Sequence, residues 1–573
     1  MIRRNLLDVA EAGSRPVRNT DVGQVCRPYL DFTGNLAIVG TPVIDLSSNT
    51  LYVVSRVREP TAFVQRLHAI DASTFADRPN SPVVIRAQVR GTGAGSLDGV
   101  IAFDSEIHNQ RAALLLAAGN VYIAWASHCD TGPYHGWIVG YDAVTLQQSF
   151  VFNDTVDGAL GGIWQAGQGL SADAEGRIYF LTGNGTSNAQ FGGRSFGSAF
   201  VKLDPRQAEP VVDWFMPYNV DILNDNDADL GSSGALLLPG TNLLLGGGKE
   251  GTFYLIDRDR LGHFGSDGDS QIVQSFHATA GHIHGSPVYW NGEGIGPTVY
   301  VWSESDYLKA FNFNGRWFDT TPTTSNMRVP DGMPGGMLSI SANAGIAGSG
   351  VVWASHPTRG DANHATRQGT LRAFDAEDVS RELWNSDMNF ARDHVGNFAK
   401  FATPVVANGK VYLSTFSDEL AVYGLLSSTG TGLLAEYFHD ANLSQTSFIR
   451  IDASVNFDWR DQSPAHSLGS ENFSVRWRGT VVPQFSEEYT FITTSDDGVR
   501  LWIDGALVID AWTDHARRED HGRVTLLAGV KFDVRMEFYE HSGDAVVQLA
   551  WSSPSQPTAV IPKTRLFPAA GPG

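Results

Sequence analysis

The feature that most constrains this fold is a unit of three short strands that recurs along most of the chain. In its clearest copy, residues 400–425, a proline-led apolar run is followed by a turn at Asn408-Gly409 and by two runs that alternate apolar and polar residues. Asn and Gly both tolerate the positive φ that a tight hairpin needs, and alternation is typical of half-buried strands. Three strands with one apolar face cannot cover that face alone, so the unit needs neighbours.

The unit occurs seven times, and a fourth, outer strand follows some copies, as at residues 82–89 and 210–214. Four antiparallel strands repeated about every 50 to 70 residues are typical of propeller blades. We therefore predict an all-β chain that begins with a seven-bladed β-propeller, residues 1–425. The copies start near residues 40, 112, 167, 234, 285, 339 and 403.

The two ends of this repeat region complement each other. The seventh copy lacks an outer strand, and residues 3–7 resemble an outer strand without a blade. We expect residues 3–7 to pair with the last blade, because a closed ring leaves no open edge. The alternative is an eight-bladed ring, N-terminally incomplete, whose first three strands are missing.

A second domain follows a change in composition. Residues 426–432 are small and polar, as in a flexible linker, and residues 433–568 contain a new set of short alternating runs. These runs predict a β-sandwich, and residues 569–573 are expected to form a disordered tail. The predicted strands lie at 473–478, 488–493, 499–503, 524–527, 532–539 and 545–551.

Charge and cysteine content restrict the partners. The formal net charge of −21 argues against nucleic acid or an anionic membrane surface as a partner. The sequence contains no apolar run of 18 or more residues, so it predicts no membrane span. The N-terminus lacks the apolar core of a secretory signal. Cys26 and Cys129, the only cysteines, are either buried thiols or, in an exported protein, a disulfide that ties the N-terminal segment to a distant blade.

Strand endings and loops of the repeat region resemble the pyrroloquinoline-quinone-type (PQQ-like) β-propeller superfamily. The resemblance spans residues 1–425 and implies the propeller fold, and the superfamily includes both quinoprotein dehydrogenases and non-catalytic scaffolds. The dehydrogenases carry two adjacent cysteines beside the quinone, whereas no two cysteines are neighbours here. The matching motifs are 68–71 (HAID), 372–375 (RAFD), 127–137, 182–185 and 247–251.

The second domain, residues 431–568, resembles the protective antigen 14-kDa (PA14) domain, a carbohydrate-associated β-sandwich. The run 489–505 carries most of the resemblance, together with 434–438, 473–479, 537–540 and 549–551. In lectin members of that family the pair that matches Asp496 and Asp497 binds Ca²⁺, which holds sugar hydroxyls. Carboxylate oxygens suit Ca²⁺; the alternative is a solvated turn in which Asp caps backbone amides. Asp510, Trp512 and Asp514 are loop candidates to complete the carbohydrate site.

In the predicted propeller, the start of each innermost strand lines the mouth of the central channel. Several histidines there could form a site for a transition metal such as Zn²⁺, Mn²⁺ or Fe²⁺, and two histidines two residues apart share one face of a strand. The alternative is separate loop histidines that bond to the backbone. The mouth candidates are His108, Gln110, Arg111, Trp164, Gln165, His282, His284, His394 and Lys400.

One acidic loop resembles part of a calcium-binding loop. Asp225, Asp227 and Asp229 alternate before Gly231, but the terminal glutamate of an EF-hand is missing. A structural Ca²⁺ is one interpretation, and a solvated acidic loop is the other.

These features predict a secreted or periplasmic monomer whose lectin-like domain targets a carbohydrate, a glycan or polysaccharide. The propeller would bind or process a ligand at its channel mouth. Three alternatives stay open: a PQQ-dependent alcohol or sugar dehydrogenase, a metal-dependent polysaccharide lyase or hydrolase, and a non-catalytic protein-interaction scaffold.

Overall fold

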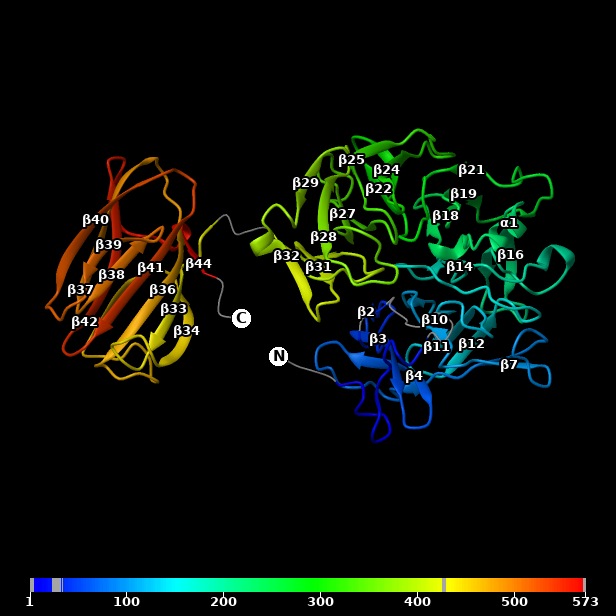
Figure 1. Cartoon of the computed structure of the whole chain (residues 1–573), viewed down its shortest axis with the longest axis horizontal. Helices are drawn as coiled ribbons and strands as arrows, with labels where there is room; N and C mark the ends of the chain where they lie inside the picture. Colours follow the sequence, from blue (N-terminus) through cyan, green and yellow to red (C-terminus); the bar gives the residue numbers. More distant parts are fainter. Residues whose placement is uncertain (1–4, 23–31, 33, 425–428, 570–573) are drawn as a thin grey trace. The chain divides into compact units, whose positions relative to one another are not determined.

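The computed structural model of the chain describes residues 5–22, 32, 34–424 and 429–569. They belong to two compact units, Met1–Gly424 (unit 1) and Leu425–Gly573 (unit 2). Both are built of strands (Figure 1), and the described α-helices are two short ones, α1 (Val220–Asp225) and α2 (Phe390–Asp393). No helix in the described part of the chain is both long and apolar enough to cross a membrane.

Unit 1 consists of antiparallel sheets that follow one another in chain order, as the repeats predict. The first has β1 (Arg15–Pro16), β2 (Val43–Asp45), β3 (Thr50–Arg58), β4 (Phe63–Asp71) and β5 (Val83–Val84). The second has β8 (His108–Asn109), β9 (Leu115–Ala117), β10 (Asn120–Ser127), β11 (Trp137–Asp142) and β12 (Gln148–Asn153). The third has β13 (Ser171–Ala172), β14 (Ile178–Leu181), β15 (Phe200–Leu203), β16 (Val211–Met216) and β20 (His263–Phe264), which pairs parallel to β16.

Four more sheets complete the series. The fourth has β17 (Leu236–Leu237), β18 (Leu243–Gly247), β19 (Thr252–Asp257) and β21 (Gln274–His277). The fifth has β22 (Val288–Gly292), β23 (Gly296–Val301), β24 (Tyr307–Asn312) and β25 (Thr323–Arg328). The sixth has β26 (Met337–Ser341), β27 (Val351–Pro357), β28 (Gly369–Asp375) and β29 (Glu382–Asn385), and the seventh has β30 (Val405–Ala407), β31 (Lys410–Ser414) and β32 (Leu420–Gly424). A separate hairpin joins β6 (Gln88–Arg90) to β7 (Val100–Ala102).

The predicted hairpin turn of the seventh sheet is present. Asn408 and Gly409 have φ of 51° and 69°, and the flanking strands β30 and β31 pair in antiparallel register from Val405–Tyr412 to Ala407–Lys410. Residues that tolerate the left-handed region therefore set this register, as expected for an Asn-Gly hairpin.

The expected N-terminal strand does not form over the described residues 5–7. Asn5 instead makes a turn, because its side-chain oxygen accepts a hydrogen bond from the Leu7 amide at 3.1 Å and its amide nitrogen donates to Asp8 at 2.8 Å. Asn side chains commonly replace strand pairing with such local bonds. The rest of the predicted strand lies outside the described residues, and the seventh sheet keeps three strands.

Each sheet of unit 1 covers an apolar face of the next. One buried cluster joins Val54 of the first sheet to Trp137 of the second, and the following clusters join second to third, third to fourth, and so on to sixth and seventh. In Figure 1 the colours pass around the unit from blue through cyan and green to yellow. The Phe32 and Phe416 rings, from the two ends of the series, lie 6.3 Å apart between centroids.

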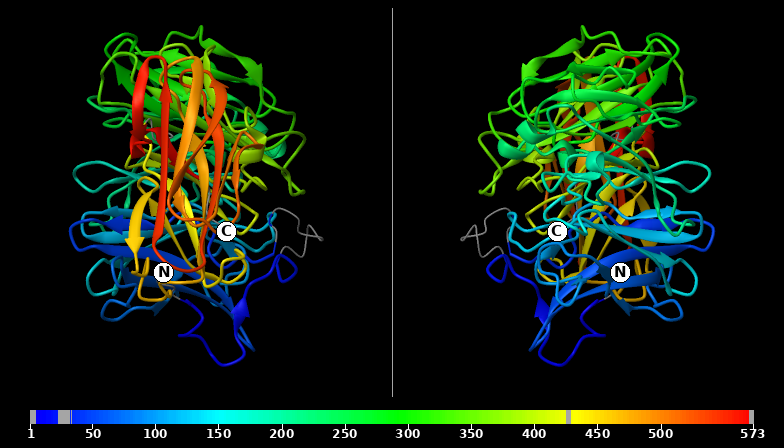
Figure 2. Two further views of the ribbon diagram at one scale, coloured as in Figure 1. Left: turned by 90° about the vertical axis from the view of Figure 1, so that its left-hand side faces the viewer. Right: turned by 90° about the vertical axis from the view of Figure 1, so that its right-hand side faces the viewer.

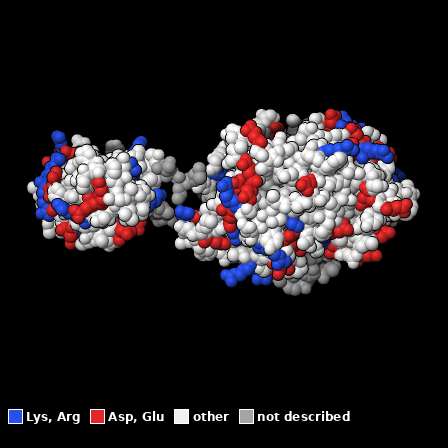
Figure 3. Space-filling model, turned by 90° about the horizontal axis from the view of Figure 1, so that it is seen from above, with Lys and Arg blue, Asp and Glu red and all other residues white. Residues whose placement is uncertain are grey.

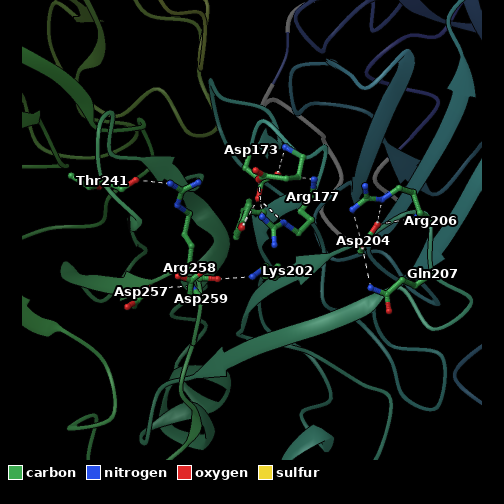
Figure 4. A network of polar contacts seen from close by, with 12 residues as sticks. Asp173, Arg177, Lys202, Asp204, Arg206, Gln207, Thr241, Asp257, Arg258 and Asp259 are labelled. Carbon is green, nitrogen blue, oxygen red and sulfur yellow. Dashed lines mark hydrogen bonds and ion pairs between the residues drawn. The ribbon is translucent and has the colours of Figure 1, made fainter.

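Charged side chains of unit 1 largely pair with one another. Acidic and basic groups are interspersed on the face shown in Figure 3. Lys202 of the third sheet donates to the Arg258 carbonyl of the fourth sheet at 2.5 Å, and within the fourth sheet Arg258 donates to the Thr241 carbonyl at 2.5 Å. Figure 4 shows this network, in which Arg177 also pairs with Asp173 at 2.8 Å. The Lys202 contact links the two sheets and the others hold turns within one sheet, so we assign the network a structural role.

Unit 2 is a β-sandwich of two antiparallel sheets, whose long strands are clear in Figure 2. One sheet has the order β34 (Thr446–Asp452), β33 (Leu433–Phe438), β36 (Phe473–Val481), β41 (Phe532–Glu540), β38 (Val499–Ile503) and β39 (Ala506–Ala511), with β44 (Leu566–Pro568) beside β36. The other has β35 (Asn456–Arg460), β42 (Ala545–Ser553), β37 (Glu487–Asp496) and β40 (Arg518–Leu526), with β43 (Gln556–Val560) beside β42. Alternate residues of both sheets, including Trp477 and Trp551, form one core.

A buried carboxylate at the end of β34 stabilises this sandwich. Asp452 is 5% exposed and accepts hydrogen bonds from the Tyr437 hydroxyl and the Trp477 indole, each at 2.8 Å. Arg450 pairs with its other oxygen at 2.6 Å. Because both aromatic donors are themselves buried, Asp452 satisfies groups that would otherwise be costly to bury.

Candidate functional site

Three loops meet at one end of the unit 2 sandwich and bring three carboxylates together. β37 ends at Asp496, and Asp497 and Gly498 turn the chain into β38. Glu540 is the last residue of β41 in the neighbouring sheet. Gly498 permits the tight approach, because a Cβ there would lie 2.2 Å from the Tyr539 ring. We call Asp496, Asp497 and Glu540 the carboxylate triad.

Backbone amides hold the first two carboxylates in place. Asp496 accepts a hydrogen bond from the Arg517 amide at 2.9 Å. Asp497, which is 5% exposed, accepts from the amides of His515 and His541, both at 3.0 Å. The two aspartates are therefore oriented by the loop between β39 and β40 and by the loop after β41, before any ligand is present.

Glu540 is the least satisfied member of the triad. It is fully buried, and neither side-chain oxygen makes a hydrogen bond. Burial, together with the charges of Asp497 and Asp496, raises the pKa of Glu540 to about 8. Burial and the Asp497 charge likewise raise the pKa of Asp496. Within the described residues, no Lys, Arg or His side chain forms an ion pair with the triad.

The donor set fits a calcium ion. Each residue offers one carboxylate oxygen, and these oxygens lie within 4.8 Å of one another. Two oxygens bound to one Ca²⁺ at its usual distances are at most about 5 Å apart. Oxygen-only, anionic ligands favour Ca²⁺ over softer metals. Asp496, Asp497 and Glu540 would thus hold the ion, and the backbone amides that orient the aspartates would keep the ligands in place.

The other residues predicted for the carbohydrate site lie around the triad with separate contacts. Trp512 packs edge-on against the Tyr539 ring at 4.7 Å. Asp514 accepts from His541 at 2.8 Å and from the Tyr539 hydroxyl at 2.7 Å, and these bonds lower the pKa of Asp514. Asp510 pairs with Arg500 at 2.8 Å and does not join the triad.

In unit 1, part of the predicted channel-mouth set gathers around Phe401. The Arg111 guanidinium lies 4.1 Å from the Phe401 ring centroid and 5.4 Å from that of Trp164. The Lys400 ammonium lies 5.4 Å from the Phe401 ring. The His284 ring lies 6.2 Å away from it, and His282 lies beside His284 at 5.8 Å.

The remaining mouth candidates are not brought into this group. His108 is buried against Trp137, whose indole donates to it at 3.1 Å, and burial lowers the pKa of His108 to about 4. The Gln110 and Gln165 side chains donate to backbone carbonyls of their own loops. His394 is exposed and stacks on Phe390. For these four residues the structure shows packing and backbone bonds.

The acidic loop before Gly231 is neutralised from within the protein. Lys249 pairs with Asp227 at 2.9 Å and with Asp229 at 2.7 Å, and Asp229 also accepts from the Asn184 amide at 2.8 Å. Asp225 is exposed at the end of α1. A lysine ammonium thus supplies the positive charge in this loop, and a calcium ion there stays a prediction.

The residues of unit 1 do not fit a quinone in the way that the dehydrogenase resemblance implies. Cys129 is disulfide-bonded, and the chain has no cysteine adjacent to it, so a vicinal disulfide to stack on the ring is missing. Cys26 lies outside the described residues, and its pairing with Cys129 stays a prediction.

Comparison with known proteins identifies the class of unit 2. Residues 430–565 match the PA14 domain family, so the predicted PA14 domain is confirmed. The chain is 45% identical over 146 residues to anti-sigma-I factor RsgI3 of Acetivibrio thermocellus, a match that covers 26% of this chain and 23% of that protein. It is 28% identical over 118 residues to protective antigen of Bacillus anthracis, a match that covers 19% of this chain and 14% of that protein. The chain therefore spans less than a quarter of these curated relatives.

Solved structures with similarity to the chain include further PA14 domains. The PA14 domain of the antifreeze protein MpAFP is 15% identical and covers 26% of this chain and 97% of that one, with a TM-score of 0.22. The PA14 sugar-binding domain from an RTX adhesin is 14% identical and covers 24% and 99%, also at 0.22. An anti-sigma factor domain-containing protein from Clostridium clariflavum is 38% identical and covers 25% and 48%, at 0.24.

Two acidic residues, Glu540 beside the aspartate pair and Glu304 beside His282 and His284, were not predicted from the sequence as metal ligands. Glu540 stands 43 residues after Asp497 in the sequence, and only the pairing of β41 with β38 brings the two together. The available signal was a charged residue in the inward-facing series of β41, after Val534, Met536 and Phe538. Glu304 lies beside His282 and His284 for a similar reason, because it follows β23 while the histidines precede β22.

Proposed function

We propose that this protein binds carbohydrate through its PA14 domain, with a calcium ion held by Asp496, Asp497 and Glu540 at the binding site. The observation that carries the proposal is the carboxylate triad, in which a fully buried glutamate without a hydrogen bond faces two aspartates. Three like charges without a basic partner are stable together only when a proton or a cation neutralises them.

The surroundings of the triad suit a sugar. A calcium ion bound here would offer its open coordination positions to sugar hydroxyls. Trp512 is half-buried between Tyr539 and the Arg500 guanidinium, which lies 4.9 Å from its ring centroid. Aromatic rings bind the apolar face of a sugar while polar groups fix its orientation. Sugar binding by the RTX adhesin PA14 domain is the same class of function.

For unit 1 we infer a seven-bladed propeller. The support is the series of seven sheets in chain order, the apolar clusters shared by each successive pair, and the contact of Phe32 with Phe416. We also infer export to an oxidising compartment, secreted or periplasmic, supported by the disulfide at Cys129.

Glycan binding by the full chain tests the proposal. The wild type is applied to a glycan array in calcium and in chelator, beside Asp497→Asn and the control Glu519→Gln, which changes an exposed acid on β40. We expect chelator and Asp497→Asn each to abolish binding, whereas Glu519→Gln keeps it. Binding that survives both chelator and Asp497→Asn would exclude the calcium-mediated mode, and the absence of any bound glycan would exclude the function.

A further inference from the structure

Unit 1 contains a second group of metal-ligating side chains, which is distinct in chemistry from the carboxylate triad. His282 and His284 precede β22, and Glu304 lies between β23 and β24 of the same fifth sheet. One ligand atom from each residue lies within 4.8 Å of the others. We call these three residues the histidine site.

The backbone holds both histidines on one side of the loop. Ile283, between them, is fully buried, its amide donates to the Gly248 carbonyl at 3.2 Å and its carbonyl accepts from the Ser232 hydroxyl at 2.6 Å. With Ile283 fixed inward, the residues on either side extend to the opposite face of an extended segment. The chain therefore orients two imidazoles in the same direction.

The loop that carries Glu304 is held against the histidine loop. The Glu304 amide donates to the His282 carbonyl at 3.1 Å. A Cβ on Gly281 would lie 2.1 Å from the Glu304 carbonyl oxygen, so only glycine allows the two loops to approach this closely. The carboxylate is thus placed beside the imidazoles by main-chain contacts and does not depend on attraction between the side chains.

The side-chain distances are those of ligands around one ion. Nε2 of His284 lies 2.8 Å from one Glu304 oxygen, and Nδ1 of His282 lies 3.5 Å from the other. Two ligands of a tetrahedral Zn²⁺, each about 2.1 Å from the metal, are about 3.4 Å apart. Nε2 of His284 is buried and makes no hydrogen bond of acceptable geometry, despite its contact with the carboxylate.

We propose that His282, His284 and Glu304 bind a divalent transition metal ion, with zinc as the representative. Two imidazoles and one carboxylate favour Zn²⁺, Co²⁺, Fe²⁺ or Mn²⁺ over Ca²⁺. The His282 side chain is 50% exposed, so the site is reachable from solvent, and three protein ligands leave coordination positions open for water or a substrate.

Metal binding by the full chain tests this site, in an Asp497→Asn background that disables the carboxylate triad. Chelator-treated protein is dialysed against micromolar zinc and its metal content measured, and a parallel titration with Co²⁺ follows the visible absorption of a histidine-bound ion. We expect about one tightly bound zinc per chain. His282→Ala and Glu304→Gln should each weaken zinc binding at least about tenfold and abolish the cobalt spectrum.

Two controls separate ligation from folding and from unrelated histidines. His277→Ala removes an exposed histidine of the preceding strand and should leave zinc binding unchanged. His282 is itself half-exposed, so His282→Ala should keep the circular dichroism and melting temperature of the metal-free protein. Zinc stoichiometry and cobalt absorption that persist in both His282→Ala and Glu304→Gln would overturn the proposal, as would the absence of tight zinc binding in the parent.

Discussion

Glu540→Gln is expected to weaken calcium binding and to raise the stability of the calcium-free protein. The substitution keeps the shape of the side chain and removes the charge that faces Asp496 and Asp497. At the outer limit of their separation, 4.8 Å, two such charges repel by about 3 kcal/mol at an effective dielectric constant of about 20. Without calcium, the variant should therefore be more stable than the wild type.

Proton linkage gives a similar magnitude. The pKa of Glu540 is raised from its usual 4.5 to about 8 in the folded protein, so folding takes up a proton at neutral pH. Stability from this group is fully present below pH 4.5 and is lost as the pH rises through about 8. Between pH 4.5 and pH 7 the wild type thus loses about 3 kcal/mol of its free energy of unfolding. The variant avoids this loss, which corresponds to a melting temperature about 10 °C higher for its PA14 domain.

The assay combines calorimetry with a calcium titration. Differential scanning calorimetry of the chelator-treated full chain measures the melting of unit 2, and isothermal titration measures calcium affinity, which should fall about 100-fold in the variant. Glu519→Gln is the matched control and should change neither quantity. A Glu540→Gln protein that binds calcium like the wild type, or that is less stable than the wild type without calcium, would refute the reasoning.

Three further predictions concern other parts of the structure. Asp452→Ala should lower the free energy of unfolding of unit 2 by about 3 kcal/mol, because the Tyr437 hydroxyl and the Trp477 indole lose their buried acceptor; a change below about 1 kcal/mol in urea titrations would contradict this. Because the pKa of His108 is lowered to about 4 by burial, this residue should contribute about 1.4 kcal/mol per pH unit to the fall in the free energy of unfolding of unit 1 from pH 6.5 towards pH 4, beside the contributions of other buried histidines whose pKa is lowered. This slope should be reduced in His108→Gln, and an equal slope in both proteins would exclude the histidine as its source. Trp512→Ala should weaken glycan binding about tenfold while isothermal titration shows unchanged calcium affinity; a parallel loss of both would make Trp512 part of the ion site.

Local sequence patterns predicted many of the strands of this chain, including those of the seven repeated units. The Asn408-Gly409 turn lies where its tolerance of positive φ places it. The β-sandwich was predictable because its inward-facing residues, such as Trp477 and Trp551, alternate along long strands, whereas the PA14 family was recognised from the motif at residues 489–505. Over the described residues 5–7, the expected N-terminal strand is replaced by a turn at Asn5, because the hydrogen bond from the Leu7 amide to the Asn5 side chain competes with strand pairing.

The composition of the sites was less predictable, because it depends on contacts between distant segments. Asp496 and Asp497 are adjacent in the sequence and could be recognised as a pair, whereas Glu540 joins them only through sheet register. Glu304 likewise reaches His284 through the approach of two loops at Gly281. Sequence alone also could not show that Lys249 neutralises the acidic loop.

The most direct test of the central claim is a crystal structure of the full chain grown with calcium, measured with anomalous scattering at a wavelength sensitive to that ion. We predict one calcium peak bound by Asp496, Asp497 and Glu540, at about 2.3 to 2.6 Å from their oxygens, with sugar hydroxyls completing its coordination when a bound glycan is added. A triad that stays free of calcium at millimolar concentration, or a glycan that binds elsewhere on the protein, would contradict the account.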